Sequence, residues 1–273
     1  MSFAASHNIE DYESLLLALQ NVLGVVVPDG QRSCLVERVE PLLANYKLDS
    51  LASLAESLQA DKADEIRSSV LEAISQRQSS WNLSPGTLNV LHKYIFAQLP
   101  EAARIWIVGC GQGQLAYAVA MEVAEYENRS GDDKGFQLFA SDTSLSDIKQ
   151  AESATYSAQQ LSGLSEEYKK SYATVNAQGD SWTMKDRIRR NLHFTQCDLT
   201  EDFQSVGAMD LIICPEVLVY FSNGVKAGIL QQFSSLLKTG GIFLTGPNQA
   251  VTPFTDGLEY VEHPEGVFYR QKS

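Results

Sequence analysis

A run of glycines near the middle of the chain has the spacing of a ligand-binding turn. Gly109, Cys110, Gly111 and Gly113 follow the apolar residues 105–108, and an Ala-, Val- and Met-rich stretch comes next. Strand, glycine turn and helix in that order can present backbone N–H groups to a ligand at close range. The spacing is G-x-G-x-G, not the G-x-G-x-x-G of dinucleotide folds, and the absence of Gly-Lys-Ser/Thr excludes a nucleotide-triphosphate P-loop. The alternative is that the glycines only permit a tight turn.

Acidic residues follow the two strands expected after this turn. Asp142, with Thr143 behind it, ends one apolar run, and Asp198, followed by Leu199, ends the next. A carboxylate at the end of a strand can accept hydrogen bonds from both hydroxyls of a bound ribose, and we assign this role to Asp142. Asp198 is placed to accept from an adenine amino group. The structural alternatives are a helix N-cap for Asp142 and a cap or loop role for Asp198.

A further group of candidates follows the fourth expected strand. Residues 214–221 read Cys-Pro-Glu-Val-Leu-Val-Tyr-Phe. We expect Glu216 and Val217 to line the ligand site, with Glu216 facing an ammonium group. Tyr220 offers an O–H group that can orient a second substrate. Alternatively, Tyr220 is an aromatic residue that packs on the sheet.

These side chains need a sheet whose strands end at one edge. Runs at 105–108, 136–140, 192–196, 209–214, 242–246 and 266–271 predict strands, most of them alternating with helices. The pattern is typical of an α/β fold with a doubly wound, mostly parallel, Rossmann-like sheet that binds ligands at the carboxyl ends of its strands. Residues 156–191 interrupt the alternation, and there we predict an inserted helix and a small antiparallel hairpin.

The first 80 residues are expected to be all helical. Leucines and other apolar residues recur there at helical spacing in four stripes, which predicts a small bundle because short helices need each other's apolar faces. We therefore expect a helical N-terminal domain at 1–80, a linker and helix at 81–100, and a ligand-binding domain at 101–273. Residues 1–80 hold 12 Asp and Glu against 6 Lys and Arg.

Composition narrows the classes of function. The formal net charge of −13 argues against binding to nucleic acid or to an anionic membrane surface. The four cysteines never form C-x-x-C and the four histidines lack metal-ligand spacing, so we expect no metal site. Without a basic-then-apolar leader or an apolar run of about 18 residues, we expect a cytoplasmic protein that does not insert into a membrane.

Segments along most of the chain match the motifs of one family. Residues 105–120 resemble a strand and the turn GCSTGEEPYS, 139–142 resemble ATDI, 154–164 resemble GxY…LxGL, and 209–221 resemble FDxIFCRNVLIYF. Lys238-Thr-Gly-Gly241 and Val267-Phe-Tyr-Arg270 also match that family's ending. The chain thus resembles the CheR family of chemoreceptor glutamate methyltransferases.

The resemblance implies S-adenosyl-L-methionine as the cofactor and a Rossmann-like methyltransferase sheet. The cofactor-binding positions it implies are Gly109, Cys110, Gly111, Gly113, Asp142, Thr143, Asp198, Leu199, Glu216 and Val217. Tyr220 is implied to be catalytic. The implied partner is a protein substrate, a chemoreceptor or a related signalling protein. The helical domain is implied to cover the cofactor and help dock the receptor, and the insertion is a small β-subdomain that can bind a receptor's tail peptide.

Several positions depart from the family's pattern. Leu83 stands where the signature TNETxFFR has an arginine, and Leu115 replaces the second glutamate of the turn. Pro215-Glu216 replaces Arg-Asn before the tyrosine motif, and Asp198 replaces an asparagine. The N-terminal region is acidic, whereas docking on an acidic receptor favours basic helices.

These departures leave two hypotheses. Methyl transfer from a sulfonium to a carboxylate depends mainly on alignment, and loss of a polar clamp costs about 2–4 kcal/mol of transition-state stabilisation. The chain is therefore either a methyltransferase with a divergent active site or a catalytically degenerate binding or regulatory module that keeps the fold. A dinucleotide-dependent oxidoreductase is disfavoured by the glycine spacing.

Overall fold

The computed structural model describes residues 8–27, 32–75, 81, 83–215, 217–246, 249 and 251–272. The chain forms two compact units. One unit comprises Met1–Arg77 with Val217–Ile229, and the other comprises Gln78–Glu216 with Leu230–Ser273.

Within the described residues, the N-terminal part of the first unit consists of four helices. They are α1 (Ile9–Leu23), α2 (Arg32–Tyr46), α3 (Leu51–Gln59) and α4 (Asp64–Ser75). The side chains of Asn8 and Ser50 accept from backbone N–H groups and cap the N-termini of α1 and α3. Leu15, Leu19 and Leu54 are fully buried in a shared core. The predicted helical character of the N-terminal region is confirmed for the residues that the structure describes.

A segment from late in the chain completes this unit. Val25 forms an antiparallel bridge with Phe221, and the amide of Val26 donates to the carbonyl oxygen of Tyr220 at 2.7 Å. Phe221 packs against the helical core. Gly24 ends α1 with φ of 66°, and a Cβ at this position would lie 2.3 Å from a methyl carbon of Val225. Only glycine fits this close approach.

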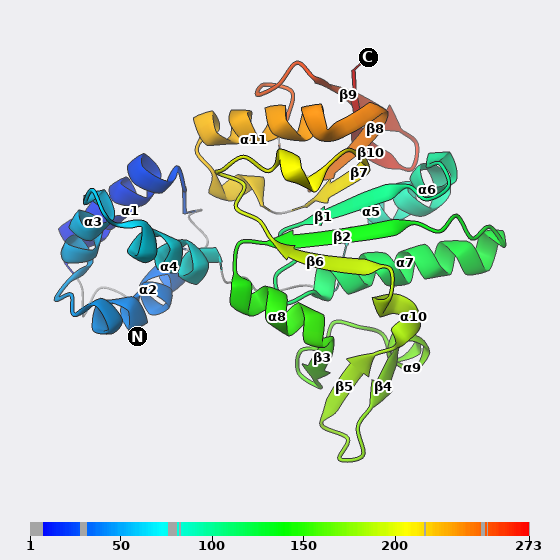
Figure 1. Cartoon of the computed structure of the whole chain (residues 1–273), viewed down its shortest axis with the longest axis horizontal. Helices are drawn as coiled ribbons and strands as arrows, with labels where there is room; N and C mark the ends of the chain where they lie inside the picture. The colour runs from blue at the N-terminus through cyan, green and yellow to red at the C-terminus, as the bar shows by residue number, and fades with distance from the viewer. Residues whose placement is uncertain are drawn as a thin grey trace. The chain divides into compact units, whose positions relative to one another are not determined.

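The second unit contains a seven-stranded sheet in the order β6-β2-β1-β7-β8-β10-β9 (Figure 1). Its strands are β1 (Arg104–Val108), β2 (Gln137–Asp142), β6 (Leu192–Gln196), β7 (Met209–Cys214), β8 (Leu237–Thr245), β9 (Leu258–His263) and β10 (Gly266–Gln271). From β6 to β8 neighbouring strands are parallel, and β10 and β9 pair antiparallel. The predicted doubly wound, mostly parallel sheet is confirmed.

The strand order places the start of the candidate site at the sheet's centre. The chain runs from β1 outward to β2 and β6, then returns to β7 on the other side of β1. In open α/β sheets, ligands bind outside the carboxyl ends of the strands where the strand order reverses. The glycine turn leaves the carboxyl end of β1 and therefore lies at this point.

Helices cover both faces of the sheet. They include α5 (Pro85–Val90), η2 (Leu91–Ile95), α6 (Phe96–Gln98), α7 (Gln114–Ser130), α8 (Leu145–Ser153) and α11 (Asn223–Leu236). The 3₁₀ turn η3 (Gln204–Val206) also belongs to the second unit, whereas the 3₁₀ turn η4 (Leu218–Tyr220) belongs to the first. Ile105 and Ile107 join the core that contains α7. On the opposite face, Trp106 packs edge-on against Phe233 of α11, with ring centroids 5.5 Å apart. This alternation is the period-two pattern of a sheet buried on both faces.

The insertion forms a β-subdomain, which we define as residues 155–191. It contains β3 (Thr155–Ser157), α9 (Glu166–Tyr172), β4 (Ala173–Val175), β5 (Ser181–Met184) and α10 (Asp186–Arg189). Its three strands pair antiparallel in the order β3-β5-β4. The predicted helix and hairpin are confirmed. The third strand, β3, was not predicted, because a three-residue strand is too short to show a hydrophobic period.

Candidate functional site

The glycine turn between β1 and α7 adopts a conformation that favours glycine at three positions. Gly109, Gly111 and Gly113 have φ of 72°, 51° and 95°, values that side-chain-bearing residues rarely adopt. The turn is fastened to the next strand, because the amides of Gly109 and Cys110 both donate to the carbonyl oxygen of Ser141, at 2.8 and 2.9 Å. The sequence pattern thus predicts a real backbone feature.

The turn differs from the expected array of ligand-facing N–H groups. The amide of Gly111 donates to Asp142 Oδ2 at 2.8 Å, and that of Gly113 donates to the carbonyl of Cys110 at 2.9 Å. With the amides of Gly109 and Cys110, four donors of the turn are therefore used within the protein. The turn offers close backbone approach and a fixed carboxylate rather than four unpaired donors.

Gly113 has a packing reason of its own. A Cβ placed on it would lie 2.8 Å from Ala151 Cβ and 2.8 Å from the Tyr156 hydroxyl oxygen. Such distances are not tolerated by real Cβ atoms, so a side chain here would displace α8 or Tyr156. Gly113 is therefore needed for close packing as well as for the turn, a reason that the glycine pattern alone does not indicate.

Asp142 lies at the end of β2 and is buried, with 8% of its surface exposed. Its Oδ2 accepts from the Gly111 amide, and its Oδ1 accepts from the Ser144 amide at 3.1 Å. The side chain of Ser144, not that of Asp142, caps α8 by accepting from Asp147 N. The N-cap alternative for Asp142 is wrong. Each carboxylate oxygen keeps acceptor capacity for a ribose hydroxyl.

Asp198 follows β6 and caps its own turn. Its Oδ1 accepts from both the amide and the hydroxyl of Thr200, each at 2.8 Å. Asp198 therefore has the predicted cap or loop role through Oδ1, and neither of these two hydrogen bonds uses Oδ2. The neighbouring amide of Cys197 donates to the carbonyl of Asp142 at 2.9 Å, which brings the ends of β6 and β2 together. Leu199 is buried, and the Gln196 side chain donates to the Thr143 carbonyl.

Cys110 is buried within the turn, with 1% exposure. Burial, followed by the nearby carboxylate of Asp142, raises the pKa of the Cys110 thiol well above its ordinary value. A neutral buried thiol is a poor nucleophile, so Cys110 packs behind the turn.

The candidates after β7 do not all belong to the unit of the glycine turn. Val217 and Tyr220 belong to the first unit, where Val217 is buried and Tyr220 is half-buried in η4. Glu216 lies outside the described residues. The structure therefore brings together the turn, Asp142 and the end of β6, and the roles of Glu216, Val217 and Tyr220 stay predictions.

Comparison with known proteins assigns the family. Residues 79–267 match the family model described as "CheR methyltransferase, SAM binding domain". The chain belongs to the CheR methyltransferase family. S-adenosylmethionine is accordingly its cofactor, and the sequence-based resemblance to CheR is confirmed.

Relatives of this CheR chain match it along nearly its whole length. A chemotaxis protein methyltransferase from Vibrio anguillarum is 29% identical over 271 residues, covering 96% of this chain and 97% of that protein. Chemotaxis protein methyltransferase 1 of Pseudomonas aeruginosa is 28% identical over 270 residues, covering 96% and 98%. The crystal structure of a TehB-like SAM-dependent methyltransferase from Corynebacterium glutamicum aligns with 70% of this chain and 90% of that chain, at 15% identity and a TM-score of 0.42.

An unpaired buried atom next to the turn fits the CheR cofactor. Gln114 is the first residue of α7 and is 3% exposed, and no hydrogen-bond partner for its Oε1 exists among the described residues. A buried acceptor left unpaired costs about 1–3 kcal/mol. An amino acid ammonium or a ribose hydroxyl of the cofactor would supply the missing donor. Gln114 is not among the residues predicted from the sequence, although its place directly after the third glycine is a usable signal.

The two leucines that depart from the CheR pattern are packed into the core. Leu83 is 6% exposed and Leu115 is 9% exposed, both in the hydrophobic cluster of the second unit that also contains Trp81. A charged side chain is costly in such surroundings unless it is paired. Leu83 and Leu115 therefore act as hydrophobic core residues in this chain.

The described part of the chain shows neither a metal-binding cluster nor a membrane-spanning helix. It contains no cluster of three or more His, Cys, Asp or Glu side chains that could hold a metal ion. It also contains no helix long and apolar enough to span a bilayer.

Proposed function

We propose that this CheR-family chain transfers the methyl group of S-adenosylmethionine to a glutamate carboxylate of a protein substrate, a chemoreceptor or a related signalling protein. The observation that carries the proposal is the Asp142 carboxylate held by the amides of Gly111 and Ser144 at the end of β2. The full-length relatives named chemotaxis protein methyltransferase support the choice of substrate class. The CheR resemblance also implies the cytoplasm as the location.

The proposed roles follow the ends of the strands. The turn residues Gly109, Cys110, Gly111 and Gly113 form the floor beneath the cofactor. Asp142 and Thr143 hold the ribose, Asp198 and Leu199 hold the adenine, and Glu216 and Val217 hold the amino acid portion. Tyr220 orients the acceptor carboxylate. The proposed domain limits remain 1–80, 81–100 and 101–273.

Methyl transfer to a carboxylate requires no proton transfer by the protein. When bound, the cofactor supplies an electrophilic methyl group on a sulfonium. A substrate carboxylate is already anionic near neutral pH, so no general base is needed. The work left to the chain is to hold the carboxylate in line and to exclude water. With Leu83 buried in place of an arginine, this alignment falls to Tyr220 and to backbone groups.

The proposal is tested by incubating the chain with methyl-labelled cofactor and a receptor's cytoplasmic fragment. Label should enter the fragment and leave it as methanol in mild base, because carboxylate esters are base-labile and N-methyl groups are not. Replacing Tyr220 by Phe should lower kcat by about tenfold to a hundredfold while leaving the affinity for S-adenosylhomocysteine unchanged, since only the acceptor's orientation is lost.

The burial of Leu83 and Leu115 favours a second candidate, a module that binds cofactor and partner without catalysis. Binding of S-adenosylhomocysteine together with a complete absence of label transfer to receptor fragments would favour this candidate over the enzyme. Restoring the family residue with Leu83→Arg provides a further comparison, because a gain of transfer would show that only the polar clamp is missing.

A further inference from the structure

The residue between the second and third glycines of the turn is held from outside the turn. The backbone oxygen of Gln112 accepts from the Tyr156 hydroxyl at 2.7 Å, and its side-chain Oε1 accepts from Gln160 Nε2 at 3.0 Å. Both donors belong to the β-subdomain, in and just after β3. The same Tyr156 hydroxyl occupies the space in which a side chain on Gly113 would lie.

A third residue closes this arrangement. Trp81 packs edge-on against Tyr156 with ring centroids 5.1 Å apart, and its Nε1–H donates to the carbonyl of Gln160 at 2.7 Å. Trp81 and Tyr156 are 5% and 1% exposed. Burial raises the pKa of the Tyr156 hydroxyl above its ordinary value, so the group stays a donor across the physiological range. We call Trp81, Gln112, Tyr156 and Gln160 the turn clamp.

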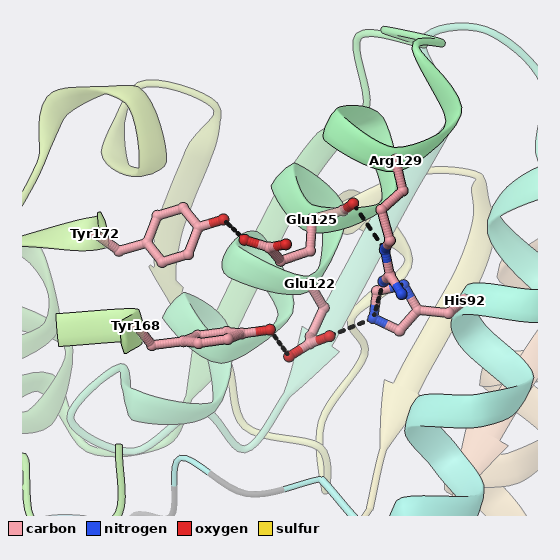
Figure 2. A network of polar contacts seen from close by, with 6 residues as sticks. All are labelled: His92, Glu122, Glu125, Arg129, Tyr168 and Tyr172. Carbon is pink, nitrogen blue, oxygen red and sulfur yellow. Dashed lines mark hydrogen bonds and ion pairs between the residues drawn. The ribbon is translucent and has the colours of Figure 1, made fainter. Parts of the chain in front are cut away.

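The β-subdomain makes a second set of contacts, with the middle of α7 (Figure 2). Tyr168 donates to Glu122 Oε1 at 3.1 Å, and Tyr172 donates to Glu125. His92 of η2 contacts the other oxygen of Glu122 through Nε2, and its Nδ1 lies 2.6 Å from a guanidinium nitrogen of Arg129. Since the guanidinium can only donate, Nδ1 accepts and the Nε2–H donates to Glu122. The subdomain therefore contacts both the turn before α7, at Gln112, and the middle of α7 itself.

We propose that the β-subdomain is the positioning element of the cofactor turn, acting through Tyr156 and Gln160. This inference rests on the proposed function, in which the turn is the floor of the cofactor site. Glycines adopt positive φ angles without strain but are also the most flexible residues, so a turn with three of them within five residues keeps one shape only where contacts hold it. The clamp supplies that constraint at Gln112, in the middle of the turn. Without the Tyr156 hydroxyl, the Gln112 carbonyl loses a donor and the turn relaxes away from the shape that the cofactor needs.

A reciprocal effect follows from this coupling. If the clamp favours the cofactor-binding shape, then bound cofactor must favour the clamped subdomain by the same factor. The cofactor should therefore slow hydrogen exchange not only at 109–113 but also at 155–161.

The test compares two hydroxyl deletions on the same subdomain. Calorimetric titration with S-adenosylhomocysteine should show about five- to tenfold weaker binding for Tyr156→Phe than for the wild type. Gln160→Ala, at a half-buried position, should weaken binding in the same direction and serves as the second variant if Tyr156→Phe does not fold. Tyr168→Phe is the matched control, since it removes a hydroxyl from the Figure 2 network and should lower the melting temperature without changing affinity.

Two results would overturn the inference. One is wild-type affinity in both Tyr156→Phe and Gln160→Ala. The other is an equal loss of affinity in Tyr156→Phe and Tyr168→Phe, because a merely structural role predicts that. The readout needs no methyl acceptor, so failure to methylate any receptor fragment would contradict the proposed function and leave the positioning role standing.

Discussion

At the scale of single residues, the two carboxylate oxygens of Asp142 accept hydrogen bonds from different parts of the candidate site. One oxygen fixes the glycine turn through Gly111, and the other fixes the start of α8 through Ser144. An acid at the end of the second strand could be predicted from the sequence because it follows an apolar run directly. Its two amide donors could not, since both depend on how the turn folds back onto β2.

A substitution at Gly113 can separate the effect of a steric clash from the effect of backbone strain on stability. Gly113→Ala should destabilise the chain by about 2–4 kcal/mol, because the new Cβ meets Ala151 and Tyr156 at 2.8 Å in addition to the strain of a positive φ. Gly131→Ala is the control. Its φ is also positive, at 69°, but nothing lies within 4 Å, so a loss of only about 1 kcal/mol is expected. Equal losses in urea unfolding would refute the packing explanation.

Cys197 makes stability depend on pH in the alkaline range. Burial, and then the nearby carboxylates of Asp198 and Glu201, raises the pKa of the Cys197 thiol from 9.0 to about 11. The unfolded chain therefore loses this proton first, and the folded state is penalised as pH rises from 9 towards 11, with full stability below pH 9.

Cys197→Ala should accordingly flatten the fall in the free energy of unfolding between about pH 9 and about pH 11, measured by urea titration. The exposed Cys34 provides the control, and Cys34→Ala should leave the slope unchanged. A wild-type slope in Cys197→Ala would show that the thiol does not carry the effect.

At the scale of elements, the alternating strands and helices were the most predictable part. The run 209–214 is buried at every position of β7, as a central parallel strand requires. The edge strand β9 was missed, since Glu259, Tyr260 and Glu262 are exposed and give no apolar run. Charged residues on an edge strand protect the sheet against pairing with another chain. The same charged residues interrupt the apolar pattern from which a strand is predicted.

Within the site, the position of the glycine turn could be predicted and its bonding could not. Alternating glycines indicate positive φ angles, which the structure shows. The donors that hold Gln112 come from the β-subdomain, far along the chain. Tyr156 and Gln160 lie in the segment 154–164 that resembles GxY…LxGL, but this motif does not indicate that their side chains donate to Gln112. Such long-range side-chain contacts depend on the finished fold.

The amino ends of three strands share one buried acid, which gives an element-scale prediction. Asp210 of β7 is 7% exposed, and its Oδ2 accepts from the Arg104 amide at 2.8 Å and from Lys238 Nζ at 2.6 Å. Asp210→Ala should cost about 1–3 kcal/mol of stability in urea unfolding, because the Arg104 amide loses its acceptor and the half-exposed Lys238 ammonium loses its carboxylate partner. Asp186→Ala, at a side chain that is 99% exposed, should change stability by less than about 0.5 kcal/mol. Similar losses in the two variants would contradict this role.

At the scale of the whole molecule, the chain passes through the helical unit twice. The apolar stripes of the first 80 residues predict the four helices, but nothing in them indicates that residues 217–229 belong to the same compact unit. The sequence therefore supports a simple order of domains, while the structure threads a segment that follows β7 into the helical unit. That segment contains Tyr220, the proposed acceptor-orienting residue.

Substitution of Phe221 tests whether residues 217–229 stabilise the helical unit. Phe221→Ala should speed hydrogen exchange in α1 and α3, because the ring packs on the core they share with Val25, and should lower the stability of that unit by about 1–3 kcal/mol. The neighbouring Val219, 38% exposed, is the control, and Val219→Ala should leave exchange in these helices unchanged. Unchanged exchange in Phe221→Ala would show that the segment is dispensable for the helical unit.

We infer that the glycine turn and Asp142 together hold an adenosyl cofactor. Calorimetric titration of the full chain with S-adenosylhomocysteine tests it most directly, with Asp142→Asn as the variant and Asp186→Asn as the exposed control. We expect saturable binding at one site, weakened by about tenfold or more in Asp142→Asn and unaltered in Asp186→Asn. Absence of binding heat at millimolar ligand, or equal affinity in the wild type and Asp142→Asn, would contradict the account.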